Sequence, residues 1–129
     1  MRTLFLIMMT VMMGHAATRF QLQDELRPDD LELKEGGYVD YFQLDVNPGE
    51  VLIEIASTEM DVCLIAFSTI DSTRYKVCVD PGYGPLQHTL QFEQARTITI
   101  GVSALFADQF GAYRMVVSGD VAGEPVPFD

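Results

Sequence analysis

The sequence predicts an all-β fold, an antiparallel sandwich of about seven or eight short strands. Apolar and polar residues alternate with a period of two along most of the chain, which is typical of strands with one buried face. Gly, Pro, Asn and Asp gather between the alternating segments, where they favour turns. No segment sustains the helical period. These observations together predict a single sandwich domain.

The first 16 residues have the three parts of a secretory leader. A positive charge follows Met1, an apolar run covers residues 4–13, and the small residues Gly14 and Ala16 precede Ala17. The run is shorter than the roughly 20 apolar residues that cross a bilayer. We therefore expect cleavage before Ala17, a secreted or periplasmic protein, and no membrane span afterwards. The rest of the chain, to residue 119, is expected to form the one domain.

The expected strands follow from the alternation. Eight cover residues 20–26, 42–46, 51–57, 62–67, 74–79, 89–93, 97–102 and 112–118, and residues 31–33 form a shorter one. Within them, the inward side chains of the later strands are Leu90, Phe92, Ile98, Ile100, Val102, Tyr113, Met115 and Val117. The segment 47–50, Asn-Pro-Gly-Glu, predicts a turn that closes a hairpin between 42–46 and 51–57. Residues 120–129 contain two Pro and a Gly and predict a flexible tail.

The two cysteines, Cys63 and Cys78, predict one disulfide. An even count in an exported chain favours a bridge, while two sulfurs are too few for a structural zinc site. The Cys-x-x-Cys spacing of a redox pair is absent. If the two cysteines face each other, the hairpin has its loop at 68–73 and the bridge lies on its outer face. The remaining pairs are then Leu64 with Val77, Ala66 with Tyr75 and Val62 with Val79 on the inner face, and Ile65 with Lys76 and Phe67 with Arg74 on the outer, solvent-side face.

The chain is acidic, with a formal net charge of −11 from 8 basic and 19 acidic residues. Binding to nucleic-acid phosphates and anionic lipid headgroups depends largely on Lys and Arg contacts. The charge therefore argues against nucleic acid as a partner and mainly favours solubility.

Several segments resemble the bacterial pre-peptidase C-terminal (PPC) domain. The segments that resemble the family are the run 40–50 followed by Val51-x-Ile53-x-Ile55, then Asp61-x-x-Leu64, Leu90-x-Phe92, and the closing Gly-Ala-Tyr-Arg-Met-Val-Val at 111–117. The chain departs from the family at 95–98, where a Gly-x-Tyr is usual, and at 80–83, where an acidic loop is usual. The resemblance implies a jelly-roll-like sandwich that assists carbohydrate or protein binding, secretion or solubility of exported enzymes. We expect the domain to stand alone here.

Catalytic and metal-binding arrangements are sparse. His88 could join Ser57 or Ser103 in a hydrolase triad, but neither serine has a Gly-x-Ser-x-Gly setting. Asp61 and Asp80 are candidate calcium ligands, although no Asp-x-Asp-x-Asp run supports them. We therefore expect no enzyme activity, no metal and no cofactor.

Exposed aromatic residues are the expected contact surface. The loop 103–110 is the most apolar loop and contains Leu105, Phe106 and Phe110, while Tyr41 and Tyr83 also fall outside the inward positions. The sequence thus predicts a non-catalytic exported binding or accessory module that engages a protein or carbohydrate of the cell envelope or extracellular space. The alternative is an inhibitor or assembly partner of a secreted hydrolase that acts through the same loop.

Overall fold

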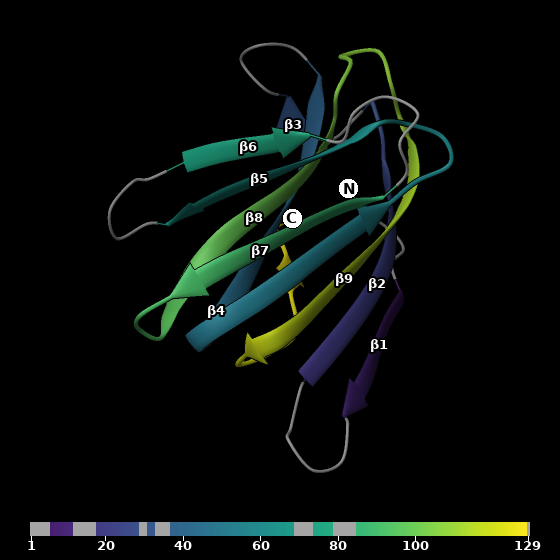
Figure 1. Cartoon of the computed structure of the whole chain (residues 1–129). Helices are drawn as coiled ribbons and strands as arrows, with labels where there is room; N and C mark the ends of the chain where they lie inside the picture. Colours follow the sequence, from purple (N-terminus) through teal and green to yellow (C-terminus); the bar gives the residue numbers. More distant parts are fainter. Residues whose placement is uncertain are drawn as a thin grey trace.

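The computed structural model describes residues 6–11, 18–28, 31–32, 37–68, 74–78 and 85–128, and within these it is built from strands and loops without a helix (Figure 1). The strands are β1 (Leu6–Val11), β2 (Thr18–Leu26), β3 (Leu31–Glu32), β4 (Tyr38–Ala56), β5 (Val62–Ser68), β6 (Arg74–Cys78), β7 (Leu86–Phe92), β8 (Arg96–Ala104), β9 (Gly111–Val121) and β10 (Val126–Pro127). All strand pairs are antiparallel. The predicted all-β antiparallel sandwich is confirmed.

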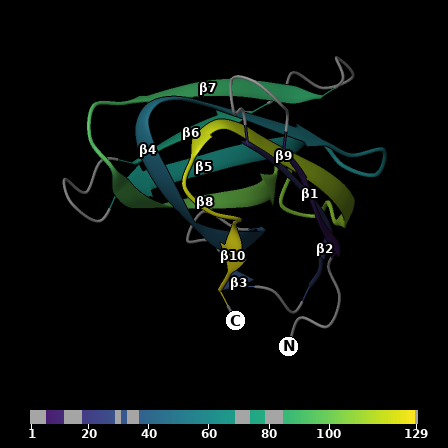
Figure 2. The same cartoon turned by 90° about the horizontal axis from the view of Figure 1, so that it is seen from below.

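The strands form two layers that share one long strand, β4. Residues 39–46 of β4 pair with β8, which continues to β5 and β6; β3 and β10 also pair with this half of β4. We call this the β8 layer. Residues 49–56 of β4 pair with β7 and β9, and β9 continues to β2 and β1. We call this the β2 layer. Figure 2 shows β4 curving between the two layers.

The hairpin predicted around residues 47–50 is wrong, because β4 passes through this segment without reversing. Residues 39–46 of β4 pair with β8, residues 49–55 pair with β7, and the register with β9 shifts between Val46 and Val51. Gly49 has a φ of 133°, and a Cβ there would lie 2.0 Å from Asp120 Oδ2. The backbone N–H of Glu50 donates to the same carboxylate at 3.0 Å. The Pro-Gly pair thus bends the strand into the second layer instead of closing a turn.

The core fills the space between the layers with alternate side chains, as the period-two pattern predicts. Phe42, Ile53 and Ile100 are fully buried. The core positions predicted in the later strands are confirmed, except that Phe92 is only partly buried against the cluster. The buried cluster comprises Phe20, Leu22, Leu26, Phe42, Leu44, Val46, Val51, Ile53, Ile55, Met60, Val62, Leu64, Ala66, Leu86, Leu90, Ile98, Ile100, Val102, Tyr113, Met115, Val117 and Val121.

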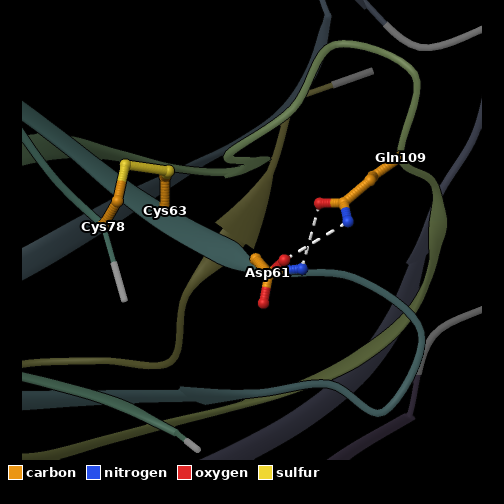
Figure 3. The surroundings of a disulfide bond; sticks show 4 residues. All are labelled: Asp61, Cys63, Cys78 and Gln109. Atoms are coloured by element: carbon orange, nitrogen blue, oxygen red, sulfur yellow. Dashed lines mark hydrogen bonds between the residues drawn. A yellow bond between two sulfur atoms is a disulfide. The ribbon is translucent and has the colours of Figure 1, made fainter. Parts of the chain in front are cut away.

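The disulfide joins β5 and β6 as predicted (Figure 3). Cys63 and Cys78 are register partners with Cα atoms 4.1 Å apart, and the other described pairs match the expected register. The outer face is less solvated than expected, since Ile65 is fully buried there with Val39 and packs with the partly buried Tyr41. The apolar patch on this side, which alternation within one hairpin could not predict, includes side chains of β4, which lies beyond β8 in the same layer.

Both ends of the chain pair with the sandwich. The predicted leader contributes β1, which lies along residues 18–23 of β2; its cleavage stays a prediction. The flexible tail expected from residue 120 differs from the structure. The last residues of β9 reach Val121, and β10 pairs with Phe42 and Gln43 of β4. The backbone N–H groups of Ala122 and Phe128 donate hydrogen bonds to the carbonyls of Asp45 and Tyr41 and hold the segment in place. The prolines of this segment are compatible with its position at the edge, because an edge strand needs few N–H donors.

Candidate functional site

The loop between β8 and β9 presents one exposed ring. Phe106 is 49% exposed, whereas Leu105 and Phe110 are half-buried. The Phe110 ring packs on Tyr38 with their centroids 5.3 Å apart. Of the three residues expected to form the contact surface in this loop, Phe106 alone projects into solvent.

Asp61 holds this loop in place. Its carbonyl accepts the backbone N–H of Leu105 at 2.7 Å. The Gln109 side chain accepts the Asp61 N–H at 3.1 Å and donates to the Asp61 carboxylate at 3.3 Å (Figure 3). The Asp61 carboxylate therefore acts as a loop tether. The second candidate calcium ligand, Asp80, lies outside the described residues, and the described part of the chain contains no cluster of three or more metal-ligating side chains.

Tyr41 lies on a different surface, the outer face of the β8 layer. Its ring sits over Gly101, where a Cβ would approach it to 2.9 Å, and faces Phe128 with their centroids 6.3 Å apart. Phe128 is 46% exposed. Tyr83 lies outside the described residues. The aromatic residues nominated from the sequence therefore do not share one platform.

A pocket of about 550 Å³ opens at the end of the sandwich where β4 finishes and β9 begins. It is lined by Gln23, Asp24, Ala56, Ser57, Thr58, Pro85, Ala112, Tyr113 and Arg114. These residues come from β2, β9, the end of β4 with the loop after it, and the residue before β7. We call this the loop-end pocket.

The shape of the loop-end pocket follows from strand pairing. Gln23 of β2 is the register partner of Arg114, and Arg114 in turn is paired with Ala56 of β4. These three positions form a row across the outer face of the β2 layer. The small side chains of Ala56 and Ala112 leave a hollow beside two long polar ones. Gln23, Thr58 and Arg114 are exposed and can reach a ligand.

Hydrogen bonds stiffen the wall of the pocket. The Ser57 hydroxyl donates to the Ala112 carbonyl at 2.7 Å and accepts the backbone N–H groups of Glu59 and Met60 at 3.0 and 3.2 Å. The Glu59 carboxylate accepts the Ala112 N–H at 2.6 Å. The loop after β4 is thus fastened to the start of β9, which fixes the backbone that carries Thr58.

Two buried carboxylates, Asp24 and Asp40, lie at the pocket and next to its lining residue Tyr113. The Tyr113 hydroxyl donates to Asp40 Oδ2 at 2.7 Å, and both residues are 3% exposed. Asp24, 6% exposed, accepts the backbone N–H of Glu25 at 2.7 Å. Tyr113 and Asp24 are register partners and line the pocket. The Asp40 bond orients the Tyr113 ring as a fixed inner wall.

The residues considered for a hydrolase triad are not brought together. His88 is half-buried on β7, at a position paired with the inward-facing Ile53 of the β2 layer. Ser103 is fully buried on β8 in the other layer. The Ser57 hydroxyl already donates to a backbone carbonyl. Ser103 therefore lies in a different layer from His88, and the Ser57 hydroxyl is engaged with the backbone.

The sequence did not point to Gln23, Thr58 or Arg114. Each is a polar residue at an outward or loop position, and such residues are common on any solvated strand face. The feature that marks the pocket is the presence of two small residues beside them, Ala56 and Ala112, which leave room at the surface. Recognising this requires the order of strands β2, β9 and β4, which alternation does not provide.

Comparisons with known proteins found distant similarity in shape. No family model and no curated protein matches the chain. The cysteine peptidase Peruvianin-I from Thevetia peruviana latex is 13% identical with a TM-score of 0.45, and the match covers 88% of this chain and 60% of that one. The chain thus spans less than two thirds of the peptidase.

Two further matches are carbohydrate-binding modules solved with oligosaccharides. TmCBM61 in complex with β-1,4-galactotriose is 14% identical with a TM-score of 0.32, over 96% of this chain and 87% of that one. The CBM22-1–GH10 modules of Clostridium thermocellum xylanase 10B with xylohexaose are 9% identical with a TM-score of 0.30, over 90% and 25%. Separately, the described residues include no helix long and apolar enough to cross a membrane.

Proposed function

We propose that this protein is a non-catalytic, exported binding module whose loop-end pocket takes a carbohydrate. The observation that carries the proposal is the convergence of exposed polar side chains from β2, β9 and the loop after β4 around a pocket that Ala56 and Ala112 also line. The volume of about 550 Å³ lies in the usual range of small-ligand sites, roughly 300–1,000 Å³.

Sugar hydroxyls both donate and accept hydrogen bonds, so a sugar site needs both kinds of partner. The Gln23 amide offers a donor and an acceptor, the Thr58 hydroxyl offers both, and the Arg114 guanidinium offers several donors. The net negative charge of the chain suits a neutral ligand better than a polyanion. This combination favours a neutral glycan.

Export is part of the proposal and has two supports. The leader features precede the domain, and the Cys63–Cys78 bridge fits an oxidising compartment outside the cytoplasm. Membership of the PPC domain family remains a proposal that rests on the sequence motifs. Under that reading, the module assists exported enzymes by binding carbohydrate near them.

A glycan array probed with the exported protein, followed by calorimetry on the best oligosaccharide, tests the proposal. Replacing Gln23→Ala or Arg114→Ala removes hydrogen bonds and is expected to weaken binding about tenfold each. Ala112→Leu is expected to abolish binding by filling the hollow. The matched control is Gln91→Ala, on the same outer face but at the far end of β7, where the side chain bonds Glu50. Equal binding by all four variants, or no glycan bound by the wild-type protein, would contradict the proposal.

A second function is favoured by the exposure of Phe106. A half-exposed ring on a loop tethered by Asp61 is a suitable anchor for a protein surface, since rigid aromatic residues often dominate such contacts. This observation supports an inhibitor or assembly partner of a secreted hydrolase. Pull-down with the wild-type protein and with Phe106→Ala tests it: loss of a captured hydrolase supports this function, and unchanged capture contradicts it.

A further inference from the structure

The outer edge of the β2 layer is occupied by β1, a segment that belongs to the predicted leader. Six register pairs join β1 to residues 18–23 of β2, from Leu6 opposite Gln23 to Val11 opposite Thr18. Figure 1 shows β1 as the outermost strand on this side. Removal of the leader before Ala17 therefore leaves the backbone of residues 18–23 without its neighbouring strand.

The β2 edge is long and regular over its central residues. Natural edge strands are commonly short or carry Pro, a bulge or charged side chains, Lys above all. β2 has nine residues, contains neither Pro nor Lys, and pairs with β9 without a register shift. Its charged residues, Arg19, Asp24 and Glu25, lie on either side of the uncharged segment 20–23. An edge of this length that already accepts an antiparallel strand is suited to accept another one.

The sequence of β2 is self-complementary when two copies pair antiparallel about Gln21. In this register Phe20 of one copy faces Leu22 of the other on the inward side, where both residues are buried against the core of their own copy. On the outward side, Gln21 faces its equivalent and Arg19 faces Gln23. In this register apolar side chains face apolar side chains, and no two like charges lie directly opposite each other. Such cross-strand pairs stabilise a pair of strands.

We propose that the exported protein forms a twofold dimer in which the β2 strands of two copies pair antiparallel about Gln21, in the place that β1 occupies before cleavage. The proposal rests on removal of the leader and is independent of the glycan pocket. The contact is isologous, because the same strand serves both subunits. The two β2 layers then form one continuous sheet.

Analytical ultracentrifugation of the exported protein tests the dimer, with its N-terminus established by mass spectrometry. Gln21→Lys and Gln21→Glu each place like charges opposite each other at the twofold axis, and each is expected to weaken the dimer about fivefold or more. Mixing the two variants is expected to restore it, because the charges then oppose each other. The control is Gln91→Lys on β7. Among the described strands, β7 lies at the opposite edge of the β2 layer, so this variant is expected to remain dimeric.

Four results would overturn the proposal. The first three are a monomer at every concentration, a dimer that both Gln21 variants keep unchanged, and a dimer whose subunits still carry Met1. The fourth is failure of the mixed variants to associate, because twofold pairing at Gln21 requires rescue. Thermal melting of each variant separates loss of association from loss of folding, since Gln21 is only partly buried and its side chain faces away from the core.

Discussion

Truncation of Ile100 tests whether the space between the two layers is the core. Ile100 is fully buried, and it pairs with Phe42 on one side and Ala66 on the other. Ile100→Ala removes three carbon atoms, which at about 0.8 kcal/mol for each buried CH₂ costs about 2.4 kcal/mol. The cavity left between the layers raises the expected loss in the free energy of unfolding to as much as about 5 kcal/mol.

The assay is urea denaturation of the protein with Phe106→Ala as the reference variant. Phe106 is 49% exposed, so its truncation is expected to change the free energy of unfolding by less than about 0.5 kcal/mol. Ile100→Ala is expected to lower the urea midpoint with an unchanged slope. A loss below about 1 kcal/mol for Ile100→Ala, or a larger loss for Phe106→Ala than for Ile100→Ala, would refute this account of the core.

Three further outcomes are expected. Thiol titration of the unreduced protein should find no free cysteine, and replacing both Cys63 and Cys78 by Ala should cost about 3 kcal/mol, as expected for a bridge enclosing a loop of about 15 residues; two reactive thiols would contradict the bridge. Gly49→Ala should destabilise the protein in thermal melts, because its Cβ would overlap Asp120; an unchanged melting temperature would refute the bend at this position. N-terminal sequencing of the exported protein should begin at Ala17, and Met1 on exported material would refute cleavage.

Alternation in the sequence predicted which residues face inward, and the structure confirms it in β8 and β9. The burial of Ile98 and Met115 could be predicted because the residues two positions along the chain, Ile100 and Val117, are also apolar. The Cys hairpin could also be registered, because one pairing between Cys63 and Cys78 fixes all the others. A period of two therefore determines faces, and one covalent pair determines a register.

Alternation could not determine which strands become neighbours across the sheet. The segment around Gly49 has the composition of a turn, yet it bends β4 from one layer to the other because β8 and β9 supply partners that are far away in sequence. The same limitation hid the loop-end pocket. Gln23, Arg114 and Ala56 become adjacent only through the pairing of β2, β9 and β4.

Mapping the bound oligosaccharide by amide chemical-shift changes tests the central claim most directly. The backbone amides of the protein are followed while the best ligand from the glycan array is added. The account predicts that the largest changes cluster at Gln23, Thr58 and Arg114, around the loop-end pocket. Changes clustered instead on the outer face of the β8 layer around Tyr41, or absent at saturating oligosaccharide, would contradict it.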